Sequence, residues 1–150
     1  MPARSIETPL GWITLTEEDG AITALDWRRG ATDDTALLRE AKRQLCAWFA
    51  HDLEAFDLPL RPAGNTFQQA VWREMRAIPY GETREYGEIA RALGAMPQPV
   101  GNACGMNSIA IIIPCHRVIG SDGKLTGYGG GLWRKRRLLD LEGAQLGILA

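Results

Sequence analysis

The hydrophobic positions in the first third of the chain follow two different periods. Between residues 5 and 27, apolar side chains recur at roughly strand spacing on either side of Glu18-Asp19-Gly20, which is typical of a turn. Between residues 35 and 50 the spacing becomes helical, with Leu38, Ala41 and Leu45 on one face. The pattern therefore predicts a β-hairpin or β-meander followed by one helix.

A Pro- and Gly-punctuated segment, residues 57–64, then predicts a linker. Beyond it, Thr66 and Gln69 have the spacing of a capping box, ahead of a helix that ends near Pro79-Tyr80-Gly81. Two short helices, 85–93 and one with Pro99 in its first turn, flank a tight turn. They predict a helix-turn-helix, although any corner between two helices shows a similar pattern.

The last third contains a β-branched run, a glycine loop and a final helix. Residues 109–113 are too short and too β-branched for a helix, so we expect a buried strand or extended segment. Residues 127–131 predict a loop, and residues 132–142 a helix that ends at Gly143. The expected fold class is α+β: a small N-terminal α/β domain (1–63) of β-meander plus helix, then a mostly helical, winged-helix-like domain (64–150).

Composition removes several classes of protein. The 150 residues are 45% hydrophobic and 23% charged, which is ordinary for a globular chain. No run approaches the length of a membrane span, and the N-terminus lacks the apolar core of a signal peptide. Three cysteines without a CxxC pair favour the reducing cytoplasm, without a metal site or disulfide framework.

The charge is unevenly distributed. The net charge of −1 combines an acidic first part with a second part that has a small basic excess. A mildly basic second part is compatible with an anionic partner, but this signal alone is weak.

Cys115 is the strongest candidate for chemistry. It follows Pro114 at the end of the apolar run, and His116 and Arg117 come directly after it. Both neighbours favour thiolate over thiol, and a thiolate is the nucleophilic form of cysteine. Cys46, in contrast, is expected to be a small buried hydrophobe on its helix face. From these residues alone, a thiol hydrolase and a plain helix-turn-helix regulator with an inert cysteine both remain open.

The segment around Cys115 resembles the acceptor motif of the O6-alkylguanine-DNA alkyltransferases. The similarity continues in order over residues 64–144, through the segments Phe67-Gln68, Val71-Trp72, Pro79 to Thr83, Tyr86 to Ala90, Val100 to Ala103, Ile112 to Gly120, Gly127 to Gly131 and Leu138 to Gly143. The resemblance implies DNA repair: the irreversible transfer of an alkyl group from O6-alkylguanine, or O4-alkylthymine, in DNA to a cysteine, once per molecule. It also implies no cofactor and no metal, and a monomer without an obligate protein partner that binds double-stranded DNA.

The resemblance also implies a role for individual residues. Cys115 would be the acceptor, His116 its water-linked base, Glu142 the carboxylate that orients His116, Asn107 a brace, and Tyr86 a donor to the leaving guanine. The substrate would contact Val118, Tyr128, Gly129 and Cys104, and DNA would contact Gln98, Arg117, Ala103 and Thr83.

The largest departure from the family pattern concerns Gln98, and two smaller ones are Ser108 and Gly129. The family inserts an arginine into the DNA stack after the base is turned out, and the matching position here is Gln98. The resemblance leaves one close rival, the alkyltransferase-like proteins that bind alkylated DNA without repairing it. That class lacks the acceptor cysteine, so Cys115 argues against it.

Overall fold

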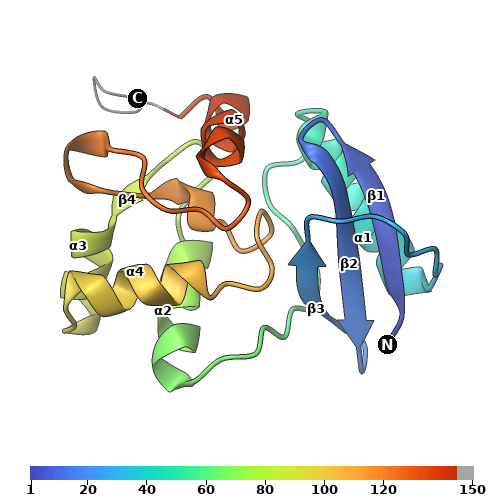
Figure 1. Cartoon of the computed structure of the whole chain (residues 1–150), viewed down its shortest axis with the longest axis horizontal. Coiled ribbons are helices and arrows are strands. Elements are labelled where there is room, and N and C mark those ends of the chain that lie inside the picture. Colours follow the sequence, from blue (N-terminus) through green and yellow to red (C-terminus); the bar gives the residue numbers. More distant parts are fainter. Residues whose placement is uncertain (145–150) are drawn as a thin grey trace. The chain divides into compact units, whose positions relative to one another are not determined.

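The computed structural model describes residues 1–144, apart from the side chain of Asp122. The chain forms two compact units, Met1–Ala63 and the part that begins at Gly64, and the division falls at the end of the Pro- and Gly-punctuated segment. Residues 145–150, which we assigned to the second domain, lie outside the described residues. A small antiparallel sheet with one helix, followed by a helical unit, confirms the predicted α+β class (Figure 1).

The N-terminal unit is a three-stranded meander covered by one helix. Strands β1 (Ala3–Thr8), β2 (Gly11–Glu18) and β3 (Ala21–Asp26) pair antiparallel in that order. Helix α1 (Ala36–Phe49) begins at Thr35, whose hydroxyl accepts from the Leu38 backbone N–H. The predicted meander and helix are both confirmed.

Two details of this unit differ from expectation. The segment predicted as a linker pairs with β3: Ile22 N–H donates to the Pro59 carbonyl, and Arg61 N–H donates to the Ile22 carbonyl. Cys46 is exposed rather than buried. The buried stripe of α1 passes through Leu38, Ala41 and Leu45, and Cys46 lies one position beyond it.

Up to residue 144, the C-terminal unit is built from the helices α2 (Thr66–Arg76), α3 (Tyr86–Leu93), α4 (Pro97–Gly105) and α5 (Leu132–Glu142). The capping box of α2 is shifted by one residue from the prediction. Asn65, not Thr66, is the N-cap: its Oδ1 accepts from the Gln68 backbone N–H, and its own backbone N–H donates to Gln68 Oε1. The two short helices α3 and α4 pack on each other around a brief turn, as the helix-turn-helix prediction requires.

A small parallel sheet joins distant parts of this unit. Strand β4 (Arg84–Glu85) pairs with β5 (Val118–Ile119), with Arg84 opposite Val118. Two short 3₁₀ turns, η1 (Cys115–Arg117) and η2 (Ser121–Gly123), flank β5. Because β4 leads directly into α3 and β5 directly follows η1, this sheet brings the start of α3 beside the Cys115 segment.

The prediction of a strand or extended segment at residues 109–113 is wrong. This segment folds into a buried turn in which Ile113 N–H donates to the Ile109 carbonyl, and Ile111 has a φ of 72°. A β-branched residue seldom adopts this left-handed conformation, since it costs about 1–3 kcal/mol. The apolar run was correctly predicted to be buried, but its backbone forms a turn instead of an extended segment.

No helix within residues 1–144 combines the length and the apolar character that crossing a membrane requires.

Candidate active site

Cys115 begins the 3₁₀ turn η1, and the side chain of Asn107 fixes the turn of the backbone that leads to it. Asn107 Nδ2 donates to the Ile113 carbonyl at 2.9 Å, and Asn107 Oδ1 accepts from the Ile109 backbone N–H at 3.0 Å. These two bonds close the buried turn that delivers the chain to Cys115. The geometry supports the predicted role of Asn107 as a brace.

His116, Arg117 and Glu142 form one buried network. His116 Nε2 lies 2.8 Å from Glu142 Oε2, and Arg117 reaches the same carboxylate with Nη2 at 2.7 Å and Nε at 3.0 Å. Both side chains that face Glu142 are buried, as is Glu142 itself. Because a carboxylate only accepts, the proton of a neutral His116 ring lies on Nε2, and Nδ1 is the basic atom of the ring.

The ionisation states suit a reaction that starts from a neutral thiol and a neutral imidazole. Burial raises the pKa of Cys115, against the opposing effects of a hydrogen bond from Asn107 and the charge of Lys135. Burial also lowers the pKa of His116, although Glu142 works in the other direction. For Glu142, burial acts to raise the pKa, but the hydrogen bonds from His116 and Arg117 outweigh it and bring it to about 2. At neutral pH, His116 can therefore accept a proton beside a permanent carboxylate.

A pocket of about 180 Å³ opens onto Cys115. Tyr86 from α3 and three residues of α4 (Gly101, Cys104 and Gly105) line it together with Gly127, Tyr128 and Gly129 of the glycine loop. The Tyr128 hydroxyl is buried and has no hydrogen-bond partner among the residues that the structure describes. A buried donor without a partner is unusual in a folded protein and indicates a place for a ligand acceptor.

Tyr86 is the second hydroxyl of the pocket. It donates to the Thr126 carbonyl over a long 3.4 Å, and burial raises its pKa, so that it remains a donor at neutral pH. Cys104 is a second thiol in the wall. Its Sγ lies 3.4 Å from Met75 Sδ, and burial raises its pKa to about 12. Cys104 therefore stays a neutral thiol.

Lys135 is a functional candidate that we did not predict from the sequence. Its ammonium is buried and donates to the carbonyls of Val118 and Thr126, each at 2.6 Å. Burial lowers its pKa to about 8. A sequence signal was present, because Lys135 lies three, four and seven residues before Leu138, Leu139 and Glu142. This spacing places it on the same helix face as these other buried residues of α5. The charge of Lys135 favours the thiolate form of Cys115.

Two of the residues that the resemblance assigned to DNA contact are buried in this structure. Arg117 is buried. Its Nε and Nη2 donate to the Glu142 carboxylate and its Nη1 donates to the Ile78 carbonyl at 2.7 Å, so its guanidinium bonds to groups inside the protein. Ala103 is buried too, and its carbonyl accepts from the Trp72 indole at 2.8 Å. Gln98 is exposed in the first turn of α4, and Thr83 is half-buried before β4. These two stay predictions.

The predicted substrate contacts are only partly brought together. Tyr128, Gly129 and Cys104 line the pocket, whereas Val118 is buried and its carbonyl already accepts from Lys135. A carbonyl has two lone pairs, so a contact with a substrate amine would use the second. The Val118 role therefore stays a prediction.

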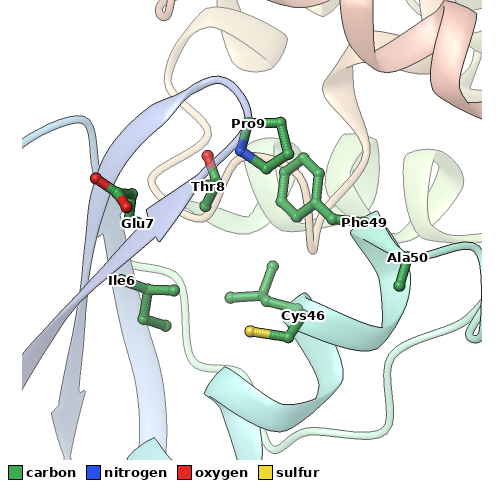
Figure 2. A pocket seen from close by; sticks show the side chains of 8 residues that line it. Ile6, Glu7, Thr8, Pro9, Cys46, Phe49 and Ala50 are labelled. Atoms are coloured by element: carbon green, nitrogen blue, oxygen red, sulfur yellow. The ribbon is translucent and has the colours of Figure 1, made fainter.

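The N-terminal unit has a cavity of its own, of about 270 Å³, between β1 and the last turns of α1 (Figure 2). Ile6, Leu45 and Phe49 give it an apolar wall, and Cys46 stands at its side. It contains none of the paired acid and base groups found around Cys115. Among residues 1–144, no cluster of three or more His, Cys, Asp or Glu side chains could hold a metal ion.

The site combines a buried thiol, a histidine–carboxylate pair and a pocket lined by the second helix of a helix-turn-helix. This arrangement is the one expected of a thiol-dependent transfer protein that acts on DNA. Comparison with known families agrees. Residues 66–144 match the DNA binding domain of 6-O-methylguanine DNA methyltransferase, and residues 2–62 match its ribonuclease-like domain. The chain belongs to the 6-O-methylguanine DNA methyltransferase family.

Individual relatives cover nearly the whole chain. A methylated-DNA–protein-cysteine methyltransferase from Mycolicibacterium paratuberculosis is 48% identical over 93% of this chain and 90% of its own length. The structure of Mycobacterium tuberculosis OGT in complex with DNA superposes with a TM-score of 0.88 at 49% identity, covering 95% of this chain and 93% of that one. S. pombe Atl1, bound to damaged DNA containing O6-carboxymethylguanine, matches only 55% of this chain and 81% of its own, at 32% identity and a TM-score of 0.50.

Proposed function

We propose that Cys115 is the residue that accepts the alkyl group, and that the group comes from O6-alkylguanine in double-stranded DNA. The chain belongs to a family that repairs DNA by alkyl transfer to a protein cysteine. The assignment to Cys115 rests on one observation: Cys115 lines the pocket beside α4, and His116, the next residue in the chain, pairs with Glu142. Cys46 is exposed in the other unit, and the Cys104 thiol already donates to Met75 Sδ.

The chemistry follows from this arrangement. His116 Nδ1 takes the Cys115 proton through a water molecule, and Glu142 stabilises the imidazolium that results. The thiolate then attacks the alkyl carbon, so that an S–C bond forms while the C–O6 bond of the substrate breaks. The electron pair of the broken bond stays on guanine, where the hydroxyls of Tyr86 and Tyr128 can donate to the developing negative charge. Because a thioether has no good hydrolytic exit, each molecule reacts once.

Mass spectrometry of the intact protein tests this function. After mixing with an excess of a duplex oligonucleotide that contains O6-methylguanine, we expect a gain of one methyl group per protein, located on the peptide that contains Cys115. Continued turnover of substrate by sub-stoichiometric protein would point to a thiol hydrolase. Binding of the duplex without any mass change would point to an alkyltransferase-like binder or a regulator.

The second helix of the helix-turn-helix, α4, is the element that we propose to enter the DNA groove. Gln98 lies exposed in its first turn, at the position where the family carries an arginine. Glutamine keeps hydrogen-bonding capacity but brings no charge, and its side chain is shorter. We therefore infer a modest affinity for duplex DNA.

Replacing Gln98 by arginine is expected to tighten binding to duplex DNA. The new charge can contact a phosphate, so the dependence of log K on log salt should steepen by about one contact. Reaction with free O6-methylguanine, which needs no base flipping, should not change. Fluorescence anisotropy over a salt series measures the first effect. Ala77→Arg is the matched control, since it adds the same charge at an exposed position just after α2. Equal binding by wild type and Gln98→Arg would show that residue 98 does not occupy the position at which the family inserts its arginine.

We further propose that the protein acts as a monomer, without a cofactor or an obligate protein partner, in the cytoplasm. In support, all the side chains of the site come from one unit of one chain, and the three cysteines are free thiols, as expected in a reducing compartment.

A further inference from the structure

The glycine loop of the pocket, residues 127–131, is fastened from α5 at both of its ends. At the beginning of the loop, Lys135 Nζ donates to the carbonyls of Thr126 (2.6 Å) and Gly127 (3.4 Å). At the end of the loop, Arg134 Nη1 donates to the Gly130 carbonyl at 3.0 Å. The first fastening is buried, whereas the second lies near the surface, where Arg134 is half-buried.

The outer fastening includes a tryptophan that is unusually exposed. Trp133 keeps 54% of its surface accessible, and the Arg134 guanidinium lies 4.6 Å from the centre of its ring. An arginine over an indole face is a favourable cation–π contact, which holds the guanidinium in place for the bond to Gly130.

The backbone of Gly131 is shaped to fit this indole. Gly131 has a φ of 95°, and a Cβ atom at this position would lie 3.2 Å from Trp133 Cδ1 and 3.3 Å from Nε1. The dihedral angle favours glycine, and a side chain at this position would also force the indole to shift by a few tenths of an ångström. Gly131 N–H also donates to the Tyr128 carbonyl at 2.9 Å, so the position of Gly131 is transmitted to Tyr128. Trp133, Arg134 and the end of the loop thus form one connected unit, which we call the loop latch.

We propose that the loop latch, Trp133 with Arg134, holds the glycine loop closed over Cys115 and so limits the size of the alkyl group that the protein accepts. This inference rests on the proposed function of Cys115. The pocket measures about 180 Å³, and a cavity of about 150 Å³ holds one benzene-sized ring. O6-benzylguanine adds a phenyl ring to the two fused rings of guanine and therefore needs more room than O6-methylguanine, which movement of the loop away from α4 can provide. Trp133 and Arg134 are positioning residues, because they act on the substrate through Tyr128 and Gly129.

The test compares two free bases, O6-methylguanine and O6-benzylguanine, in single-turnover reactions followed by protein mass. Free bases exclude any effect of α5 on DNA binding. We expect Arg134→Ala and Trp133→Ala to raise the ratio of benzyl to methyl transfer rates by about two- to five-fold, the size of effect that one cation–π contact can supply. Trp133→Phe, which keeps an aromatic face, should restore most of the wild-type ratio. Arg134→Gln provides a second neutral variant with a long polar side chain, and it should behave like Arg134→Ala.

Arg137→Ala is the matched control, because it removes the same charge from an exposed position on the same helix. Its rate ratio should equal that of the wild type. In parallel, hydrogen exchange of the peptide 127–135 should be faster in Arg134→Ala and Trp133→Ala than in Arg137→Ala. A rate ratio that stays constant in all variants, or that shifts equally in Arg137→Ala, would overturn the latch. Absence of any transfer by the wild-type protein would instead overturn the proposed function.

Discussion

In the Cys115→Ala variant we expect alkyl transfer to be lost completely, while binding to duplex DNA with O6-methylguanine persists. Alanine removes the nucleophile but leaves the Asn107 bonds to Ile109 and Ile113 unchanged. The other thiol of the pocket is not expected to take over, because Cys104 Sγ donates to Met75 Sδ at 3.4 Å, whereas His116 directly follows Cys115 in the chain. Intact mass after incubation with excess substrate, together with an anisotropy titration, measures both quantities.

The control for this variant is Cys46→Ala. It also deletes a thiol, but from an exposed position in the N-terminal unit, and it should still gain one methyl group. A methyl group found on Cys104 in the Cys115→Ala protein would show that the pocket, rather than one activated cysteine, selects the acceptor. That result would contradict the roles assigned above to His116 and Glu142.

Glu142→Gln should produce the second large effect, on both rate and stability. A neutral amide leaves the buried Arg117 charge without its partner, and its NH₂ group meets donors from Arg117 and His116. Removing one partner of a buried ion pair costs on the order of 3–5 kcal/mol. The transfer rate should fall by about 10²-fold or more, since the imidazolium loses its carboxylate. Urea unfolding and single-turnover kinetics measure the two losses.

The effect of this substitution on stability should depend on pH. The pKa of Glu142 is lowered from its ordinary value of 4.5 to about 2, so its carboxylate stabilises the fold fully above about 4.5. This contribution is lost as the pH falls towards 2, and the stability difference between wild type and Glu142→Gln should narrow over that range. Glu82→Gln, at an exposed position of the same unit, should show no such difference. Equal transfer rates for wild type and Glu142→Gln across pH would exclude a role of Glu142 in the proton transfer from Cys115 to His116.

The elements that sequence reasoning located correctly depend on local signals. Helices α3 and α5 end at Gly94 and Gly143, which have left-handed φ values of 63° and 67°, and glycine marks such ends directly in the sequence. The acceptor motif could also be identified from the sequence, because its residues are consecutive in the chain. The shift of the α2 cap from Thr66 to Asn65 arises because both side chains can cap, and each has a glutamine three residues later.

The features that were missed depend on contacts between distant residues. The curled segment at 109–113 is held by the Asn107 side chain, which supplies the backbone partners that a strand would otherwise need. Arg117 stands beside the acceptor in sequence, but its direction is decided by Glu142 and by the Ile78 carbonyl, 39 residues earlier. The burial of Lys135 was not predicted, because it depends on carbonyls that only the folded loop presents.

The order in which the buried network is completed has a consequence for synthesis of the protein. His116 and Arg117 precede their carboxylate by 26 and 25 residues, and Glu142 is the last residue of α5. A chain made from its N-terminus therefore exposes the cationic partner well before the anionic one. The contacts of Glu142 with His116 and Arg117 form only after residue 142 has emerged, whereas the meander and α1 lie within the first 63 residues. We therefore expect a nascent chain to be unable to transfer an alkyl group until Glu142 has been synthesised.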